Sequence, residues 1–178
     1  PPMSDTTKRI LDIAERTARQ GGYNSFSFRE IAAEIGIKSA SVHYHFPTKE
    51  ILGEALAERY TNRFLETLGA PDTDSPQEML RRYVATYGKA LKNDGLMCLC
   101  GMFGAEIDHL PDSVARKTRS FFERNMAWLE HVCVASGLGE KAAHQRAAHM
   151  IASLEGAMIL ARSMRDDTIF DAVAADLI

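Results

Sequence analysis

The sequence of 178 residues lacks a long apolar segment and a recognisable leader. No run of about 18 or more apolar residues occurs, so we expect no membrane-spanning helix. No charged, then apolar, then small-residue signal opens the chain, and we therefore expect a cytoplasmic protein instead of a secreted one. We interpret Met3, which follows Pro1 and Pro2, as the natural first residue.

Cysteine is scarce, and its spacing does not fit a metal site. The three cysteines are Cys98, Cys100 and Cys133. A cytoplasmic protein does not keep structural disulfides, so we expect three buried thiols. Side chains two positions apart on a helix point about 200° apart. Cys98 and Cys100 are therefore expected neither to bind one metal ion together nor to bond to each other.

Local motifs of catalysis and metal binding are also missing. We find no nucleophile with a base at a recognisable spacing, no phosphate-binding glycine loop and no local pair of carboxylates. His144 and His149 are five positions apart, whereas two imidazoles share a helix face at a spacing of four. We therefore expect no enzyme activity, no cofactor and no bound metal.

The composition is that of a globular protein with an uneven charge distribution. Apolar residues make up 46% of the chain, which is long enough to bury a sizeable core. The net charge of −3 argues against a protein that coats nucleic acid by bulk charge. Residues 1–60 carry eight basic and eight acidic side chains, and the remainder carries 13 and 16. The acidic excess therefore lies outside the N-terminal third.

Apolar residues recur at helical spacing along nearly the whole chain, and no convincing alternation of period two occurs. We therefore predict an all-α protein, with helices over residues 6–20, 28–35, 39–46, 49–68, 77–92, 96–108, 113–136, 141–164 and 168–177. One face of the helix over 49–68 carries Leu52, Leu56, Tyr60, Phe64 and Leu68. Residues 69–76 form the only loop-like stretch of low apolar content and mark the nearest feature to a domain boundary.

The segment from Ser27 to Lys49 predicts two short helices joined by a tight turn, followed by the start of the long helix. Ser27 and Glu30 have the spacing of a capping box, which fixes where the first short helix begins. Gly36 stands where a left-handed residue ends a helix, and Ile37 follows it as a buried anchor. The turn between the two helices is therefore predicted by local sequence.

The second short helix has an unusual outward face. Ser39 is placed to cap it, and the inward side chains are expected to be Ala40, Val42 and Phe46. The outward and terminal positions hold Lys38, Ser41, His43, Tyr44 and His45. Hydroxyl, imidazole and phenol groups suit base edges and phosphates in a nucleic-acid groove, and Lys49 adds a cation and free backbone amides. The alternative is a helical hairpin whose aromatic side chains simply pack.

The same segment resembles the DNA-binding module of the TetR/AcrR family of transcriptional regulators. The family pattern is matched in order by Ser27, Arg29, Ile31, Ala32, Gly36, Ile37, Ser39, Ala40, Val42, Tyr44, His45, Phe46 and Lys49. One position departs, because His43 stands where the family usually has a phosphate-contacting tyrosine and Tyr44 follows it. Either side chain is therefore a candidate for the phosphate contact. The resemblance covers residues 6 to about 60 specifically, and the remainder only in length and helical rhythm.

The resemblance implies a fold and a mode of action. The fold is an N-terminal three-helix head with a helix-turn-helix, joined by a long helix to a C-terminal helical domain. We assign residues 1–50 to DNA binding and residues 51–178 to effector binding and dimerisation. A homodimer would place two recognition helices roughly 34 Å apart on a palindromic operator in double-stranded DNA. A small apolar or amphipathic effector would release this repressor from DNA, and no membrane is involved.

Three sets of side chains follow from this interpretation. The predicted DNA-binding residues are Lys8, Ser27, Arg29, Lys38, Ser39, Ala40, Ser41, His43, Tyr44, His45 and Lys49. The resemblance implies an effector pocket, for which the candidates are Tyr83, Tyr87, Leu91, Cys98, Met102, Phe103, Phe121 and Met126. The predicted dimer interface is Phe122, Leu129, Ile151, Leu154 and Met158, and the alternative is that these residues form the core of one chain. Asp12, Glu34 and Glu58 are expected away from the DNA, which predicts modest, salt-sensitive affinity.

Three other functions stay open at this point. A thiol-based repressor would use Cys98 or Cys100 to sense an electrophile or oxidant, as regulators that the sequence resembles do. A small all-α enzyme would use one of the same cysteines as a nucleophile. A helical adaptor would use the helix-turn-helix to hold protein instead of DNA.

Overall fold

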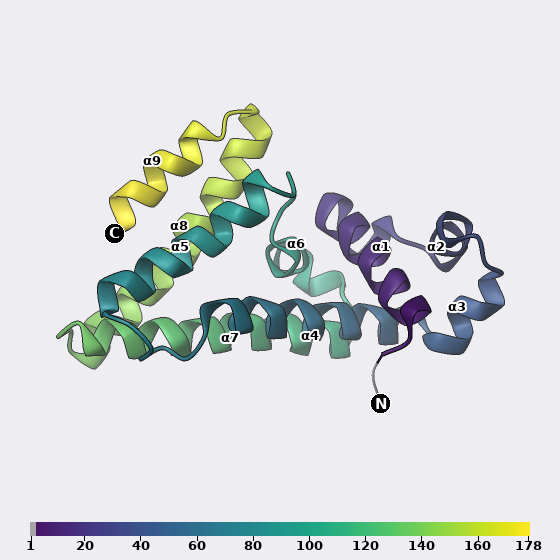
Figure 1. Ribbon diagram of the computed structural model, residues 1–178, viewed down its shortest axis with the longest axis horizontal. Helices are drawn as coiled ribbons and strands as arrows, with labels where there is room; N and C mark the ends of the chain where they lie inside the picture. The colour runs from purple at the N-terminus through teal and green to yellow at the C-terminus, as the bar shows by residue number, and fades with distance from the viewer. Residues whose placement is uncertain (1–2) are drawn as a thin grey trace. The chain divides into compact units, whose positions relative to one another are not determined.

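The computed structural model describes residues 3–178, which form nine α-helices and two short 3₁₀ turns and contain no strand (Figure 1). Pro1 and Pro2, on which the interpretation of Met3 depends, lie outside the described residues. Within residues 3–178 no helix combines the length and apolar content that crossing a membrane requires. The helices are α1 (Asp5–Gly21), α2 (Phe28–Ile35), α3 (Ser39–His45), α4 (Lys49–Leu68), α5 (Pro76–Lys92), α6 (Leu99–Ala105), α7 (Asp112–Ala135), α8 (Glu140–Met164) and α9 (Thr168–Leu177). The 3₁₀ turns are η1 (Tyr23–Ser25) and η2 (Ile107–His109).

The predicted all-α fold is confirmed, and one predicted helix is wrong. The helix expected over 96–108 is limited to α6, with a separate 3₁₀ turn after it. Leu96, Met97 and Cys98 precede α6 outside any helix, and all three are buried. Burial on an irregular backbone outweighs the local helical preference here, because propensity is a weak prior that tertiary packing overrides.

The chain divides into two compact units. Unit 1 comprises residues 3–61 and 99–121, and unit 2 comprises residues 62–98 and 122–178. Helices α4 and α7 each pass from one unit to the other, between Thr61 and Asn62 and between Phe121 and Phe122. The structural division therefore differs from a simple cut after residue 50, because α6 and the first part of α7 group with the N-terminal helices.

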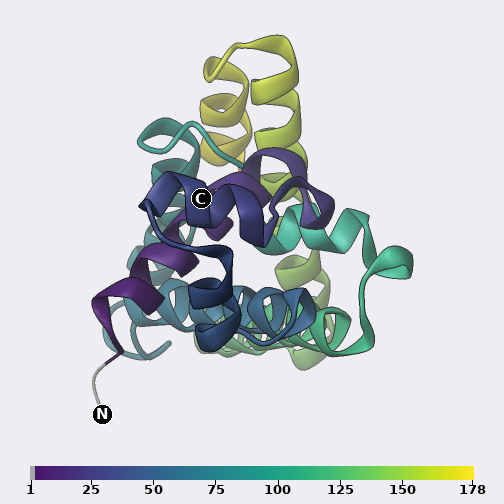
Figure 2. The same ribbon diagram turned by 90° about the vertical axis from the view of Figure 1, so that its right-hand side faces the viewer.

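Unit 1 is built around one apolar stripe of α4 and the inner faces of α1 to α3. Leu52 and Leu56 of α4 are fully buried, as are Ile10 of α1 and Val42 of α3. Figures 1 and 2 show α1, α2 and α3 grouped together. Burying such side chains stabilises a structure by about 1.5–3 kcal/mol each. The short helices α2 and α3 depend on this packing, since isolated helices under about 12 residues are marginal in water.

Unit 2 has a core rich in aromatic rings. Tyr83 of α5 stacks on Trp128 of α7 with ring centroids 5.7 Å apart, and Phe64 of α4 meets the edges of Tyr83 and Tyr87. Helices α8 and α9 lie side by side in Figure 1 and contact each other along their lengths. Phe170 of α9 packs close to the backbone of α5 at Gly88. The buried faces of α5, α8 and α9 therefore belong to one core.

Replacing Gly36 by alanine tests the turn that separates α2 from α3. Gly36 has φ +82° and ψ +33°, and a methyl group added there would meet no atom within 4 Å. We expect Gly36→Ala to lower the free energy of unfolding by about 1 kcal/mol, because only the left-handed backbone and not a steric clash opposes it. Urea denaturation measures the change.

The matched control is Gly156→Ala in α8, where an added methyl group also meets nothing within 4 Å but the backbone is helical. This change should raise the free energy of unfolding by about 0.5–1 kcal/mol. Equal effects of the two substitutions would contradict the role given to the left-handed turn.

Candidate nucleic-acid interface

The turn of the helix-turn-helix is defined by its caps. Ser27 Oγ accepts the backbone N–H of Glu30 at 3.2 Å and donates to the Glu30 carboxylate at 3.1 Å. At the other end of α2, the N–H groups of Gly36 and Ile37 both donate to the Ala32 carbonyl. The left-handed conformation at Gly36 allows both N–H groups to reach the same carbonyl oxygen. These local interactions confirm the predicted turn, although Ile37 is half-buried instead of fully buried.

The start of α3 differs from the prediction in two respects. The residue at the cap position is Lys38, whose side chain makes no capping hydrogen bond, and Ser39 is the first helical residue. The role predicted for Ser39 as a cap is therefore wrong. Ala40 is exposed and not inward-facing, while Val42 and Phe46 are buried as expected. Ser39, Ala40 and Ser41 consequently lie together on the accessible side of α3, where small side chains permit close approach.

The side chains of His43 and Tyr44 differ in how freely they can reach a ligand. Tyr44 is 85% exposed, and its ring meets the His45 ring edge-on with centroids 5.3 Å apart. The His43 ring packs edge-on against Phe28, with centroids 4.6 Å apart, and its Nδ1 lies 3.4 Å from the Pro47 carbonyl oxygen. The Tyr44 hydroxyl is therefore the better placed of the two to bind a phosphate.

His45 is held by α1 and is not free. Its Nδ1 is 2.9 Å from Thr7 Oγ1, and Thr7 Oγ1 is 2.8 Å from Ser4 Oγ. Ser4 also caps α1 by accepting the backbone N–H of Thr7. The half-buried His45 ring thus joins the end of α3 to the start of α1. This geometry supports positioning of α3 more directly than contact with nucleic acid.

Four acidic side chains of unit 1 form ion pairs with basic side chains that do not belong to α3. Arg59 pairs with Asp12 at 2.8 Å and with Glu15 at 3.0 Å. Glu34 of α2 forms an ion pair with Arg16 of α1. The third carboxylate expected to face away, Glu58, pairs with Lys117 at 3.0 Å.

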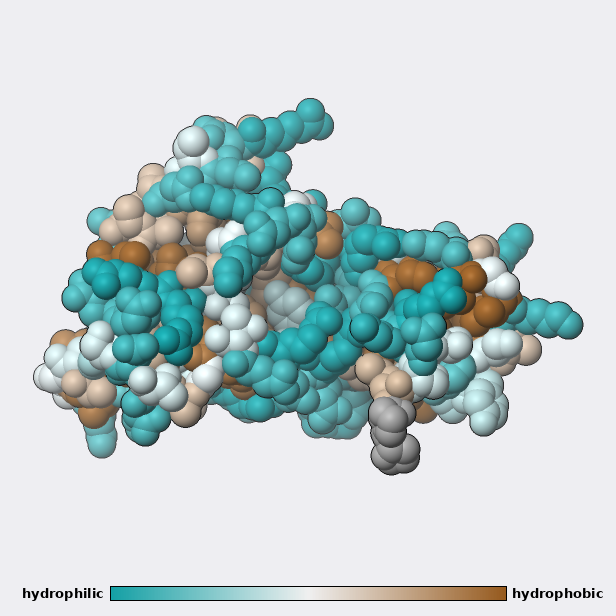
Figure 3. All heavy atoms as spheres, in the orientation of Figure 1, coloured by the Kyte–Doolittle hydropathy of each residue, from teal (hydrophilic) through white to brown (hydrophobic). Residues whose placement is uncertain are grey.

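Three cations near the turn lack such partners. Within residues 3–178, Lys8, Arg29 and Lys38 form no ion pair, and all three are exposed. Over this part of unit 1 hydrophobic side chains show between hydrophilic ones (Figure 3), and Ile35 and Ile37 are half-buried there. The charge of the head is therefore neutral in sum, with the unpaired cations Arg29 in the first turn of α2, next to Glu30, and Lys38 just before α3.

Lys49 is placed differently from these exposed cations. Its Nζ lies 4.8 Å from the ring centroid of Tyr23 and 4.6 Å from that of Phe26. Burial lowers the pKa of this ammonium, while the nearby carboxylates of Glu106 and Glu30 raise it. The Lys49 side chain therefore stabilises the head through cation–π contacts, and its backbone amide stands at the start of α4, where helix N–H groups attract anions.

Sequence reasoning missed two residues that position the head. Glu106, which follows α6, accepts the backbone N–H of Tyr23 at 2.9 Å. A methyl group on Gly22 would lie 2.2 Å from Glu106 Oε1, so glycine is needed for this approach. Arg9 of α1 donates to the carbonyl of Ile35 at the end of α2 at 3.5 Å. Contacts between residues so distant in sequence leave no local signal.

The predicted effector-pocket residues are divided between the two units. Tyr83, Tyr87, Leu91, Cys98 and Met126 lie in unit 2, and Met102, Phe103 and Phe121 lie in unit 1. In unit 2, Tyr83 donates to the Asn125 side-chain oxygen and Tyr87 to Glu155 Oε1, both at 2.9 Å. The Cys98 thiol hydrogen-bonds the same carboxylate, and Glu155 Oε2 is buried without a hydrogen-bond partner. The pocket itself stays a prediction.

The predicted interface residues are largely buried within their own chain. Leu129, Leu154 and Met158 are fully buried, Ile151 is nearly so, and Phe122 is half-buried. The large apolar side chains that α7 and α8 do expose are Val134, Ile159, Leu160 and Met164. These four exposed side chains, and not the predicted five, are therefore the ones directly accessible to a partner. The interface itself stays a prediction.

Comparisons with known proteins agree with this geometry. The family model for bacterial regulatory proteins of the tetR family matches residues 10–56, and the model for the C-terminal domain of LmrA/YxaF-like transcriptional regulators matches residues 76–176. A TetR transcriptional regulator from Legionella pneumophila has 34% sequence identity and a TM-score of 0.92, with 99% of this chain and 97% of that chain covered. A TetR-family regulator from Agrobacterium tumefaciens has 30% identity and a TM-score of 0.88, with 97% and 95% covered.

Curated relatives match over shorter segments. The HTH-type transcriptional repressor DhaR from Mycobacterium sp. strain GP1 is 26% identical over 135 residues, which is 73% of this chain and 66% of DhaR. An uncharacterised HTH-type regulator from Xanthobacter autotrophicus is 32% identical over 62 residues, or 35% of this chain and 31% of that protein. The chain thus spans less than two thirds of the length of the curated relatives it matches.

The buried carboxyl of Glu155 should make stability depend on pH. Burial raises its pKa, and the hydrogen bonds from Cys98 and Tyr87 lower it in part. The folded protein therefore binds this proton more tightly than the unfolded chain, and the free energy of unfolding falls as pH rises between the unfolded and folded pKa values. Glu155→Gln removes this loss of stability, so urea denaturation should show the variant gaining stability relative to the wild type as the pH rises above about 4.3, the ordinary pKa of a glutamate carboxyl.

Glu123→Gln, on the exposed side of α7, is the control for removing a carboxylate. Its stability relative to the wild type should change little over the same pH range. A flat difference for Glu155→Gln would mean that this carboxyl is not destabilised by burial.

Proposed function

Because the chain belongs to the TetR family of bacterial transcriptional regulators, we propose that it represses transcription by binding a palindromic operator as a homodimer. The observation that carries this proposal is the exposed face of α3, which presents Tyr44 and Ser41. Lys38 just before α3 and Arg29 in the first turn of α2 are exposed and form no ion pair within residues 3–178. Cations and hydroxyl groups bind phosphates, and small side chains let the helix enter the major groove. Such a protein acts where its DNA is, in the cytoplasm, and by binding instead of catalysis.

Two copies would associate through the C-terminal helices of unit 2. Ile159 is 53% exposed and Met164 is 64% exposed on α8, and Val134 is 46% exposed near the end of α7. Large exposed apolar side chains favour an interface, because their burial removes apolar surface from water. A two-fold dimer would present two α3 helices to half-sites about one turn of DNA apart.

The effector would be recognised around the buried polar cluster of unit 2. Glu155 Oε2 has no hydrogen-bond partner, and leaving a buried acceptor unsatisfied costs about 1–3 kcal/mol. An effector that donates to this oxygen would stabilise the conformation that holds it. Release from the operator requires only that the effector prefer the conformation with misplaced heads.

Covalent modification of a thiol is the less favoured route to the same release. Cys98, Cys100 and Cys133 are all buried and free. Burial also raises the pKa of the Cys133 thiol, which the nearby Arg146 lowers only in part. Buried thiols are ordinarily unreactive because the nucleophile is the thiolate. Reversible effector binding is therefore favoured over covalent modification, because it does not require a buried thiol to become exposed and ionised.

The DNA-binding role of the free cations can be tested by charge removal. An operator is first selected from random-sequence DNA, and affinity is then measured by fluorescence anisotropy at several salt concentrations. Arg29→Gln and Lys38→Gln should each weaken binding and reduce the slope of log affinity against log salt by about 1, since each loses one phosphate contact. Lys141→Gln, which removes an exposed charge from α8 in unit 2, is the matched control.

Two results would go against this account. If Arg29→Gln and Lys38→Gln kept the slope of Lys141→Gln, the α2–α3 face would not be the DNA-contacting surface. If the wild-type protein selected no sequence, the proposed repressor function itself would fail.

The proposed dimer can be tested at its most exposed apolar position in mid-helix. Ile159→Glu should convert the dimer to a monomer in analytical ultracentrifugation, because a carboxylate would be buried without a partner. Operator affinity should fall as well, since one half-site is bound at a time. Ile107→Glu, at an exposed isoleucine of unit 1, should leave the mass unchanged. A dimeric Ile159→Glu protein would place the interface elsewhere.

A further inference from the structure

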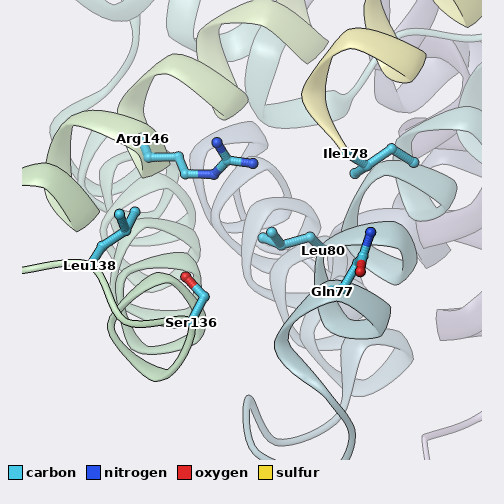
Figure 4. A pocket seen from close by; sticks show the side chains of 6 residues that line it. All are labelled: Gln77, Leu80, Ser136, Leu138, Arg146 and Ile178. Atoms are coloured by element: carbon cyan, nitrogen blue, oxygen red, sulfur yellow. The ribbon is translucent and has the colours of Figure 1, made fainter.

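A small cleft lies in unit 2, apart from the buried polar cluster. Its volume is about 260 Å³, and Figure 4 shows the side chains that line it: Gln77, Leu80, Ser136, Leu138, Arg146 and Ile178. They come from the first turns of α5, the segment between α7 and α8, the N-terminal half of α8 and the residue after α9. The volume lies just below the range of 300–1,000 Å³ typical of sites for drug-sized ligands, so a small ligand is the suitable occupant.

The walls of the cleft are apolar, and one positive charge stands among them. Leu80 is buried, Leu138 is half-buried and Ile178 is exposed, so aliphatic surface is available on opposite sides. The guanidinium of Arg146 extends toward the space between Leu138 and Leu80 (Figure 4). A site that combines aliphatic walls with one cation is complementary to an amphipathic anion.

The guanidinium of Arg146 has no counter-ion of its own. Its Nη2 donates to the backbone carbonyl of Leu177 at 3.0 Å, and the guanidinium also hydrogen-bonds the Cys133 side chain and acts on it by its charge. Neither partner carries a negative charge. Among residues 3–178 no carboxylate forms an ion pair with Arg146. An arginine has five N–H donors in a planar fork, so most of its donors remain for a ligand.

Three of the four basic residues of α5 in the same unit are neutralised by carboxylates, and the fourth, Lys89, is exposed to solvent. Arg82 pairs with Asp74 at 3.1 Å, Arg81 pairs with Glu78 at 3.6 Å, and Lys92 pairs with Asp171. Within residues 3–178 the cation at the cleft thus has no carboxylate partner, whereas most of the basic residues of α5 do. Charge complementarity therefore selects an anion instead of a neutral or cationic occupant.

We propose that this cleft binds a small aliphatic monocarboxylate, with its carboxylate on the Arg146 guanidinium and its chain along Leu80, Leu138 and Ile178. A carboxylate matches the planar fork of arginine with two parallel hydrogen bonds. The Gln77 amide, at the same cleft, supplies a further donor. The Ser136 hydroxyl already donates to the Cys133 carbonyl at 2.6 Å, so it offers only its lone pairs and not its proton.

This binding site is distinct from the effector site proposed above. The cleft contains none of the residues of the Tyr83, Tyr87, Asn125 and Glu155 cluster. The inference does not depend on DNA binding, because the cleft lies wholly in unit 2. An occupant would touch α5, α8 and the end of α9 together, and so would stabilise the packing of α9 on its neighbours.

The test uses hexanoate as the probe and the full chain without DNA. Ligand-observed NMR titrations compare hexanoate with hexan-1-ol and hexylammonium, which share its chain but not its charge. Hexanoate should bind saturably, and both analogues should bind at least about tenfold more weakly. Arg146→Gln should weaken hexanoate binding by about tenfold or more, whereas Lys141→Gln, which removes an exposed charge from the same helix, should leave it unchanged.

A second variant keeps the test decisive if Arg146→Gln loosens α9. Ser136→Asp places a carboxylate at an exposed position of the cleft. It should occupy the guanidinium and abolish hexanoate binding while circular dichroism stays that of the wild type. Absence of saturable binding, equal binding of hexan-1-ol, or full binding by both variants would overturn the proposal. None of these results bears on the affinity for an operator.

Discussion

The surface proposed to read DNA depends on the burial of two side chains. Helix α3 has seven residues, too few to be stable alone, so its orientation comes from Val42 and Phe46, which are buried in unit 1. The hydrogen bond between His45 and Thr7 fixes the other edge of α3 to α1. With the inner face held in this way, Tyr44 is left outside. The outward face therefore stays free because the inward face is tightly packed.

Electrostatics in the head depends on which charges are paired and not on their sum. Arg59 and Arg16 take up the carboxylates of Asp12, Glu15 and Glu34, whereas Arg29 and Lys38 remain unpaired within the described chain. Surface ion pairs contribute little to stability. Their consequence here is spatial, since they neutralise carboxylates of α1 and α2 and leave Arg29 and Lys38 without a carboxylate partner. A protein with net negative charge can bind DNA through such a region, with affinity that falls as salt screens it.

Unit 2 holds two polar features of opposite character. The carboxylate of Glu155 is buried with one oxygen unsatisfied, and the guanidinium of Arg146 stands at an open cleft without a counter-ion. Burial makes the first costly to ionise, and the second is costly only if a ligand desolvates it without pairing it. A ligand that donates a hydrogen bond would satisfy the Glu155 oxygen, and an anionic ligand would neutralise the Arg146 guanidinium. They lie on separate sets of residues, so one ligand at each is compatible with the packing of the helices around them.

Local sequence determined the helices, the turn at Gly36 and the apolar stripe of α4, because spacing and capping are properties of neighbouring residues. Family resemblance identified the DNA-binding module from the same short segment. Tertiary structure alone decided which polar groups are free. Lys49 lies over Tyr23 and Phe26, and Glu106 accepts the Tyr23 amide from 83 positions away. Periodicity shows which face of a helix is apolar, but it does not specify the neighbour, and the neighbour decides whether a charge is used inside the protein or left for a ligand.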